Sequence, residues 1–266
     1  MKAAEWKDYS VIATGDGYKL ERWGKEILLR PDPQVIWKSS VNMDKYPNLA
    51  AKYERSETGG GRWIYKKELP SEWSVSYKDL KFKIKPMGFK HTGLFPEQAV
   101  NWDTMRALIT SSEREISVLN LFAYTGGATV ACLKAGASVC HVDAAKAMVE
   151  RAGENVRLSG LPNKNVRYII DDCKKFVERE LRRGRKYDAI IMDPPSYGRG
   201  ANGEVWKLET ELFPLVTLCE KVLSDNPLFF LINSYTTGLQ PQVIKNVLEI
   251  AVGKKRGGKT EAYEVG

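Results

Sequence analysis

The chain has 266 residues, of which 43% are hydrophobic and 28% are charged, a composition typical of folded globular proteins. Its formal net charge of +8 favours a polyanionic partner such as a nucleic acid. No apolar run approaches the roughly 20 residues that a membrane-spanning helix needs, and the N-terminus lacks the apolar core of a secretory signal. We therefore predict a cytoplasmic protein without membrane contact.

Cysteine and histidine usage argues against a metal site. The four cysteines, none of them at C-x-x-C spacing, are Cys132, Cys140, Cys173 and Cys219. Their neighbours read as core strands and helices, which indicates reduced, buried thiols in a cytosolic protein. The only histidines, His91 and His141, do not stand at ligand spacing from a cysteine, so we predict no metal.

Residues 1–87 are predicted to form a small β-rich module. Short apolar or aromatic runs alternate there with turn signals, as at residues 15–17 and 30–33. Trp73–Tyr77 and Leu80–Ile84 alternate apolar and polar residues, as half-buried antiparallel strands do. Five of the seven tryptophans fall in this module. We expect them to pack in its core, the alternative being a stacking surface for bases.

Residues 88–266 show helix and strand patterns in alternation. Apolar runs predict strands at residues 117–122, 138–142, 166–170, 187–192 and 228–232. Helical patterns are found at residues 102–109, 127–135, 145–158, 173–183, 208–223 and 241–251. This succession predicts an α/β fold with a doubly wound, Rossmann-like parallel sheet.

The first strand of this sheet ends in a glycine turn that leads directly into a helix. The sequence there is Asn120-Leu121-Phe122-Ala123-Tyr124-Thr125-Gly126-Gly127. Glycine lets the backbone approach a ligand closely, and the N-terminus of the next helix would point at that ligand. The turn lacks the G-x-G-x-x-G spacing of dinucleotide binders, and tight packing explains the glycines equally well.

Acidic residues end the next two strands. Asp143 lies about 20 residues after the glycine turn, where a carboxylate can accept hydrogen bonds from ribose hydroxyls. Asp171 and Asp172 end the third strand, where a nucleoside pocket can place the adenine amine, and we prefer Asp172 for this role. Since Asp143 and Asp172 both precede helices, an N-cap role is the alternative for each.

The fourth strand runs into Asp193-Pro194-Pro195-Ser196-Tyr197. Proline has no N–H and a fixed φ, so the strand cannot continue through the pair. The resulting loop offers a carboxylate, backbone carbonyls and an aromatic ring, which are groups that hold a flat, amine-bearing base. Open α/β sheets bind ligands at the carboxyl ends of their strands, so the four loops predict one site. Tyr197 either stacks on the base or packs under the loop.

Together these motifs resemble the class I S-adenosylmethionine-dependent methyltransferases, and within them the bacterial 23S rRNA large-subunit methyltransferases, over about residues 88–250. The resemblance implies S-adenosyl-L-methionine as cofactor, with Asp143 on its ribose and Asp172 on its adenine amine. Residues 91–98 resemble the entry into the family's catalytic domain. The other cofactor-binding residues that it implies are Phe95, Gln98, Phe122, Ala123, Tyr124, Thr125, Gly126, Gly127, Ala144, Asn155, Asp171, Cys173 and Asp193.

The same resemblance places Asp193 and Pro194 at the target base, with Tyr197 beside them as the third catalytic residue. Methylation at C5 of a pyrimidine usually requires a cysteine nucleophile, and neither the fourth-strand loop nor the fifth contains one. We therefore predict direct transfer to a nitrogen of a base in ribosomal or other structured RNA. The alternatives are a methyltransferase of small molecules or proteins, and an inactive RNA-binding module that retains the cofactor.

A complete sheet of this class has seven strands, the last two forming an antiparallel hairpin. After the fifth predicted strand and its helix, the sequence leaves room only for residues 261–265. We interpret the C-terminal strands as truncated or unusually short.

Overall fold

The computed structural model describes residues 1, 5–56, 60–88, 90–161, 165–199, 205–236 and 238–266. The chain forms two compact units, one spanning Ala3–Ala99 and the other Val100–Gly266 together with Met1–Lys2. The domain boundary that the sequence analysis places after residue 87 stays a prediction.

The Ala3–Ala99 unit is built on a five-stranded sheet. In spatial order its strands are β1 (Tyr9–Gly15), β2 (Tyr18–Trp23), β3 (Glu26–Pro31), β4 (Leu49–Arg55) and β5 (Gly61–Tyr65). Neighbouring strands are antiparallel except β3 and β4, which run parallel. The long connection between β3 and β4 allows this reversal, so the expected antiparallel module is a mixed sheet. A separate antiparallel hairpin joins β6 (Trp73–Tyr77) to β7 (Leu80–Ile84), as predicted.

The tryptophans of this unit differ in burial. Trp23 is fully buried beneath the bidentate ion pair of Arg30 and Glu21, whose atoms lie 2.6 and 2.8 Å apart. Trp6, Trp63 and Trp73 are half-buried, whereas Trp37 is 52% exposed. Core packing is therefore the role of Trp23, and Trp37 departs from it.

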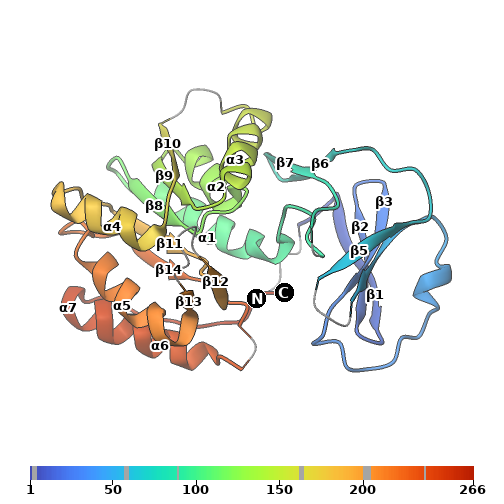
Figure 1. Cartoon of the computed structure of the whole chain (residues 1–266). Coiled ribbons are helices and arrows are strands. Elements are labelled where there is room, and N and C mark those ends of the chain that lie inside the picture. Colours follow the sequence, from blue (N-terminus) through green and yellow to red (C-terminus); the bar gives the residue numbers. More distant parts are fainter. Residues whose placement is uncertain (2–4, 57–59, 89, 162–164, 200–204, 237) are drawn as a thin grey trace. The chain divides into compact units, whose positions relative to one another are not determined.

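The second unit contains a five-stranded parallel sheet (Figure 1). In spatial order its strands are β10 (Val166–Ile170), β9 (Ser138–Asp143), β8 (Ser117–Leu121), β11 (Ala189–Met192) and β14 (Phe229–Ile232). The helices of this part of the chain are α1 (Ala99–Thr110), α2 (Gly127–Lys134), α3 (Lys146–Leu158), α4 (Cys173–Arg182), α5 (Leu208–Glu220), α6 (Pro241–Leu248) and α7 (Lys254–Arg256). The predicted doubly wound sheet is confirmed, and every predicted strand of it is present.

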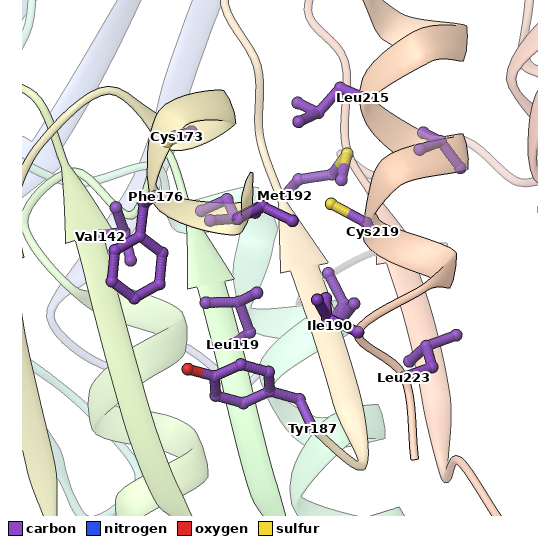
Figure 2. Close-up of a cluster of buried hydrophobic side chains, with 14 of the residues drawn as sticks. Leu119, Val142, Cys173, Phe176, Tyr187, Ile190, Met192, Leu215, Cys219 and Leu223 are labelled. Carbon is purple, nitrogen blue, oxygen red and sulfur yellow. The ribbon is translucent and has the colours of Figure 1, made fainter. Parts of the chain in front are cut away.

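Successive side chains of a strand point to opposite faces of the sheet, and different helices cover the two faces. Leu119 and Leu121 of β8 belong to a hydrophobic cluster that also contains residues of α4 and α5, such as Phe176 and Leu215 (Figure 2). Asn120, which points to the other face, donates a hydrogen bond to Thr129 of α2. Strands covered on both faces explain why the sequence shows continuous apolar runs rather than alternation.

Two details of the second unit, the hairpin after β11 and the end of the last helix, differ from the prediction. β12 (Tyr197–Arg199) and β13 (Val205–Lys207) form a short antiparallel hairpin that we did not predict. The last predicted helix ends at Leu248 and continues as a π-helical turn, Glu249–Gly253. Among the described residues after β14 no further strand is formed.

No helix in the described part of the chain combines the length and the apolar character needed to cross a membrane.

Candidate active site

The connection from β8 to α2 has an unusual backbone. Phe122 and Tyr124 adopt left-handed conformations, with φ of +52° and +50°, and Gly126 follows with φ of +82°. Non-glycine residues reach this region at a cost on the order of 1 kcal/mol or more each, so the surrounding structure must hold them there.

Hydrogen bonds from neighbouring elements fix this connection. The Phe122 N–H donates to Cys173 Sγ at 3.3 Å, and the Ala123 N–H to the Val142 carbonyl at 3.0 Å. The Tyr124 N–H donates to Asp143 Oδ2 at 2.8 Å. Three successive N–H groups are thus held by the end of β9 and the start of α4. Behind them, the buried Asn155 side chain donates to the Thr125 carbonyl at 2.9 Å.

The two glycines of the turn are required by packing. A Cβ on Gly126 would lie 2.8 Å from Cβ of Ala152, and one on Gly127 would lie 2.8 Å from the Trp102 ring. Close contact of α2 with α3 and α1 therefore accounts for both positions, which is the packing role left open above. Their contact with the methionine end of a cofactor stays a prediction.

Asp143 ends β9 and faces this connection. Its Oδ1 accepts the Ala145 N–H at 2.9 Å while Oδ2 accepts that of Tyr124. Burial raises the pKa of this carboxyl, and the two N–H donors act in the opposite direction. The N-cap of α3 is Ala145, so Asp143 is not the cap that we considered as its alternative role. Each carboxylate oxygen can accept a further hydrogen bond, which suits the hydroxyls of a ribose.

The two acids after β10 have different protein partners. Asp172 is the N-cap of α4 and accepts the Lys175 N–H at 2.9 Å. Asp171 is paired with Arg179 and accepts the Asp172 N–H. The alternative role of Asp172 as a helix cap is therefore present in the structure. Binding of an adenine amine by either acid stays a prediction.

The loop after β11 is hydrogen-bonded to the segment that follows β14. The Met192 carbonyl, just before Asp193, accepts the Asn233 N–H at 2.8 Å, and the Ser196 and Thr236 hydroxyls lie 2.7 Å apart. These bonds tie the loops that follow β11 and β14 together. Tyr197 begins β12 and is 51% exposed, and its stacking on a base stays a prediction.

Strand register brings the predicted residues to one edge of the sheet. Met192 pairs with Leu121, Leu121 with Val142, and Ile170 with Asp143. The loops that begin with Phe122, Asp143, Asp171 and Asp193 therefore start side by side. Ala144 and Cys173 continue two of them, and the buried Asn155 reaches the first from α3.

Phe95 and Gln98 belong to the Ala3–Ala99 unit. Phe95 is the N-cap of a 3-10 helix, Pro96–Gln98, in which Gln98 is buried. Their contact with the cofactor stays a prediction.

Trp206 of β13 was missed by the sequence analysis. Its indole N–H donates to the Pro195 carbonyl at 2.6 Å, and its ring centroid lies 5.2 Å from that of Phe122. The signal for it was weak, because three-residue strands have no periodicity of their own.

A buried polar chain beneath the glycine turn was also missed. Asn120 donates to the Thr129 hydroxyl at 2.9 Å, and that hydroxyl lies 2.9 Å from Nδ1 of His141. All three side chains are buried. Burial lowers the pKa of His141 to about 4, so its ring is neutral at pH 7.

All four cysteines are free and buried. Burial raises the pKa of Cys132 to about 12 and that of Cys140 to about 11, and it also raises those of Cys173 and Cys219. Since the thiolate is the nucleophile, none of these thiols is prepared for attack on a base. No group of three or more metal-ligating side chains is found among the described residues.

Comparison with known proteins identifies the family. The profile of the S-adenosylmethionine-dependent methyltransferases matches residues 36–237. The chain belongs to this family. The predicted cofactor class and enzyme class are thereby confirmed.

Relatives agree with this assignment. The chain is 34% identical, over 174 residues, to ribosomal RNA large subunit methyltransferase K/L of Allochromatium vinosum. The aligned residues cover 65% of this chain and 21% of that protein. The same-named protein of Shewanella sp. strain MR-4 is 32% identical over 191 residues, 71% of this chain and 26% of that protein. The chain thus spans about a quarter of the length of these curated relatives.

Solved structures show the same fold. The S-adenosylmethionine-dependent methyltransferase of Agrobacterium tumefaciens is 35% identical, with a TM-score of 0.88 over 93% of this chain and 79% of that one. SMU.776, a methyltransferase complexed with SAH, is 22% identical with a TM-score of 0.74, over 97% of this chain and 68% of that one. At that identity the second comparison supports the fold alone.

Replacement of Asp143 by alanine should weaken binding of S-adenosylmethionine about 10- to 150-fold, because charge-assisted hydrogen bonds contribute roughly 1.5–3 kcal/mol. Calorimetric titration measures this. Asp143→Asn keeps one acceptor oxygen and should lose less. Asp225→Ala, at an exposed aspartate before β14, is the control and should bind as the wild type does. Equal affinity in Asp143→Ala and the control would contradict the ribose role.

Acid should destabilise the second unit through His141. The folded-state pKa of about 4 lies below the ordinary value near 6.5, so the unfolded chain binds the proton first. The stability contributed by neutral His141 is complete above about pH 6.5 and is lost as the pH falls toward 4, at up to about 1.4 kcal/mol per pH unit. Urea unfolding at pH 7, 6 and 5 should show a smaller loss in His141→Asn than in the wild type. Equal losses would rule out this titration.

Proposed function

We propose that this chain transfers a methyl group from S-adenosylmethionine to a nitrogen of a base in structured RNA, with ribosomal RNA as the substrate. The observation that carries the proposal is the Asp193-Pro194 loop. It lies beside the connection from β8 to α2, residues 122–127, which we call the cofactor loop, at one edge of the sheet. It contains no thiol. The names of the relatives supply the choice of ribosomal RNA.

The hydrogen-bonding groups at this edge of the sheet suit S-adenosylmethionine. A sulfonium methyl group, which S-adenosylmethionine supplies when bound, is already activated for transfer. Asp143 would hold the ribose, since its half-buried carboxylate is oriented by two backbone N–H donors. Asp172 or Asp171 would accept from the adenine amine, and residues 122–127 would enclose the methionine end.

On the substrate side, the chain would act mainly by orientation. The Asp193 carboxylate and the Pro194 carbonyl are acceptors on adjacent residues, so an amine can donate one N–H to each. A nitrogen held in this way would keep its lone pair clear of both acceptors and available to the methyl group that S-adenosylmethionine would supply. Asp193 can also take the proton that the nitrogen loses after transfer.

Features of the surface support an RNA substrate. The net charge is +8, and the half-exposed Tyr197 lies opposite Lys207 in the β12–β13 hairpin. A ring beside a cation suits an unpaired nucleotide, since bases stack on aromatic side chains and phosphates attract lysine. A base in a duplex would have to be flipped out. A cytoplasmic location, where ribosomal RNA is found, is part of this proposal.

Buried thiols favour nitrogen over carbon as the acceptor. A C5 methylation needs a cysteine that adds to the pyrimidine ring, and all four cysteines are buried with raised pKa values. Direct in-line transfer to a nitrogen needs only alignment and exclusion of water.

The decisive experiment is transfer of a tritiated methyl group to ribosomal RNA fractions, followed by mass spectrometry of the nucleosides. We expect an N-methylated nucleoside. A 5-methylcytosine product would overturn the argument from the thiols. Label in protein or in small molecules, with none in RNA, would favour the alternative substrates.

Replacing Asp193 by alanine should separate binding from transfer. Without the carboxylate the amine loses an acceptor, so transfer should fall about 10²- to 10⁴-fold while cofactor affinity changes little. Asp193→Asn, which keeps the shape and one acceptor oxygen, should retain more activity than Asp193→Ala. Single-turnover rates and calorimetry measure the two effects. Equal loss of cofactor affinity and of transfer in Asp193→Ala would refute the assignment to the substrate side.

A further inference from the structure

Trp206 contacts both loops of the candidate site. Its indole N–H donates to the Pro195 carbonyl at 2.6 Å, which fixes the loop that carries Asp193 and Pro194. Its ring lies against Phe122, with centroids 5.2 Å apart and planes inclined by 53°. Phe122 is the first residue of the strained cofactor loop, where its N–H is held by Cys173.

The surroundings give Trp206 a fixed place. The residue is half-buried and packs against the hydrophobic cluster that contains Met192 and Leu208. The Leu208 N–H, at the start of α5 directly after β13, donates to the Ser196 carbonyl at 3.0 Å, so this segment and the Pro195 loop are joined at a second point. A side chain held in this way can transmit the position of one loop to the other.

The chemistry of the indole suits this role. The indole N–H is a donor only, so it cannot accept a hydrogen bond from a substrate amine. By donating to the Pro195 carbonyl, it occupies one of the two lone pairs of that oxygen and anchors the backbone there. The bond thereby holds in place the segment that would present the Asp193 carboxylate and the Pro194 carbonyl to the amine.

We propose that Trp206 is a positioning residue that sets the distance between the cofactor loop and the substrate loop (residues 193–197). This inference rests on the proposed function, since it takes Asp193 and Pro194 as the substrate-holding groups. Transfer between two bound groups is sensitive to displacements of about 1 Å, so loosening this contact should slow the reaction more than it weakens binding.

Two substitutions separate the ring from its N–H. Trp206→Phe keeps an aromatic ring near Phe122 but removes the donor to Pro195, and Trp206→Ala removes both. The control is Trp63→Phe in the Ala3–Ala99 unit, where a half-buried tryptophan also donates to a backbone carbonyl, that of Met87, at 2.8 Å. The measurements are thermal unfolding, SAH affinity by calorimetry, single-turnover methylation of ribosomal RNA, and amide hydrogen exchange.

For Trp206→Phe we expect single-turnover methylation at least tenfold slower, with the affinity for SAH and the KM for RNA within threefold of the wild type. Exchange of the Asp193, Ser196 and Tyr197 amides should be at least threefold faster, while residues 166–182 exchange as before. Trp206→Ala should also weaken SAH binding at least threefold, because Phe122 loses its ring contact. Trp63→Phe should change none of these quantities.

Unchanged exchange at residues 193–197 in Trp206→Phe would overturn the inference, whatever the substrate is. So would a wild-type rate in that variant. If the wild type itself methylates no RNA, the proposed function fails instead, and hydrogen exchange still decides whether Trp206 holds the loop.

Discussion

The left-handed backbone between β8 and α2 is the constraint on which the rest of the site depends. Phe122 and Tyr124 remain in a costly conformation only because Cys173, Val142 and Asp143 accept the N–H groups of three successive residues. These acceptors come from the end of β9 and the start of α4, so the loop forms only when the parallel sheet is already in register. The backbone conformation of residues 122–124 therefore depends on the register of the sheet.

This dependence explains why several motifs have two readings in the sequence. Asp172 caps α4, and Gly126 allows α2 to approach Ala152, so each has a structural reason that involves no ligand. Asp143 supports the Tyr124 N–H with one oxygen while each of its oxygens keeps a lone pair for a further donor. At the edge of such a sheet, the residues that end one element and begin the next are also the residues nearest a ligand. Structural and functional roles coincide there, and choosing one does not exclude the other.

The parts of the fold that were predictable are those set by local physics. Apolar runs located the strands because both faces of the sheet are covered, and the proline pair ended β11 because proline cannot donate to a ladder. The parallel β3–β4 pair and the β12–β13 hairpin depend on contacts between distant or very short segments, which leave no periodicity. Partners such as Arg179 for Asp171, or Trp206 for Pro195, are likewise set by packing. The acidic residues of the candidate site were therefore predictable from the sequence, whereas the groups that orient them were not.

In the proposed methyl transfer, the contribution of the protein is mainly geometric. In direct methyl transfer the donor is already activated, so the protein contributes alignment, exclusion of water and a place for one proton. Alignment depends on how rigidly two loops are held relative to each other, and the contacts between the loops and their neighbours determine this. Cys173 and Trp206 hold Phe122 from two sides, the first through the backbone and the second through the ring. Trp206 alone of the two also reaches the substrate loop. The relative position of the two loops therefore depends on this packed group as well as on the strand register.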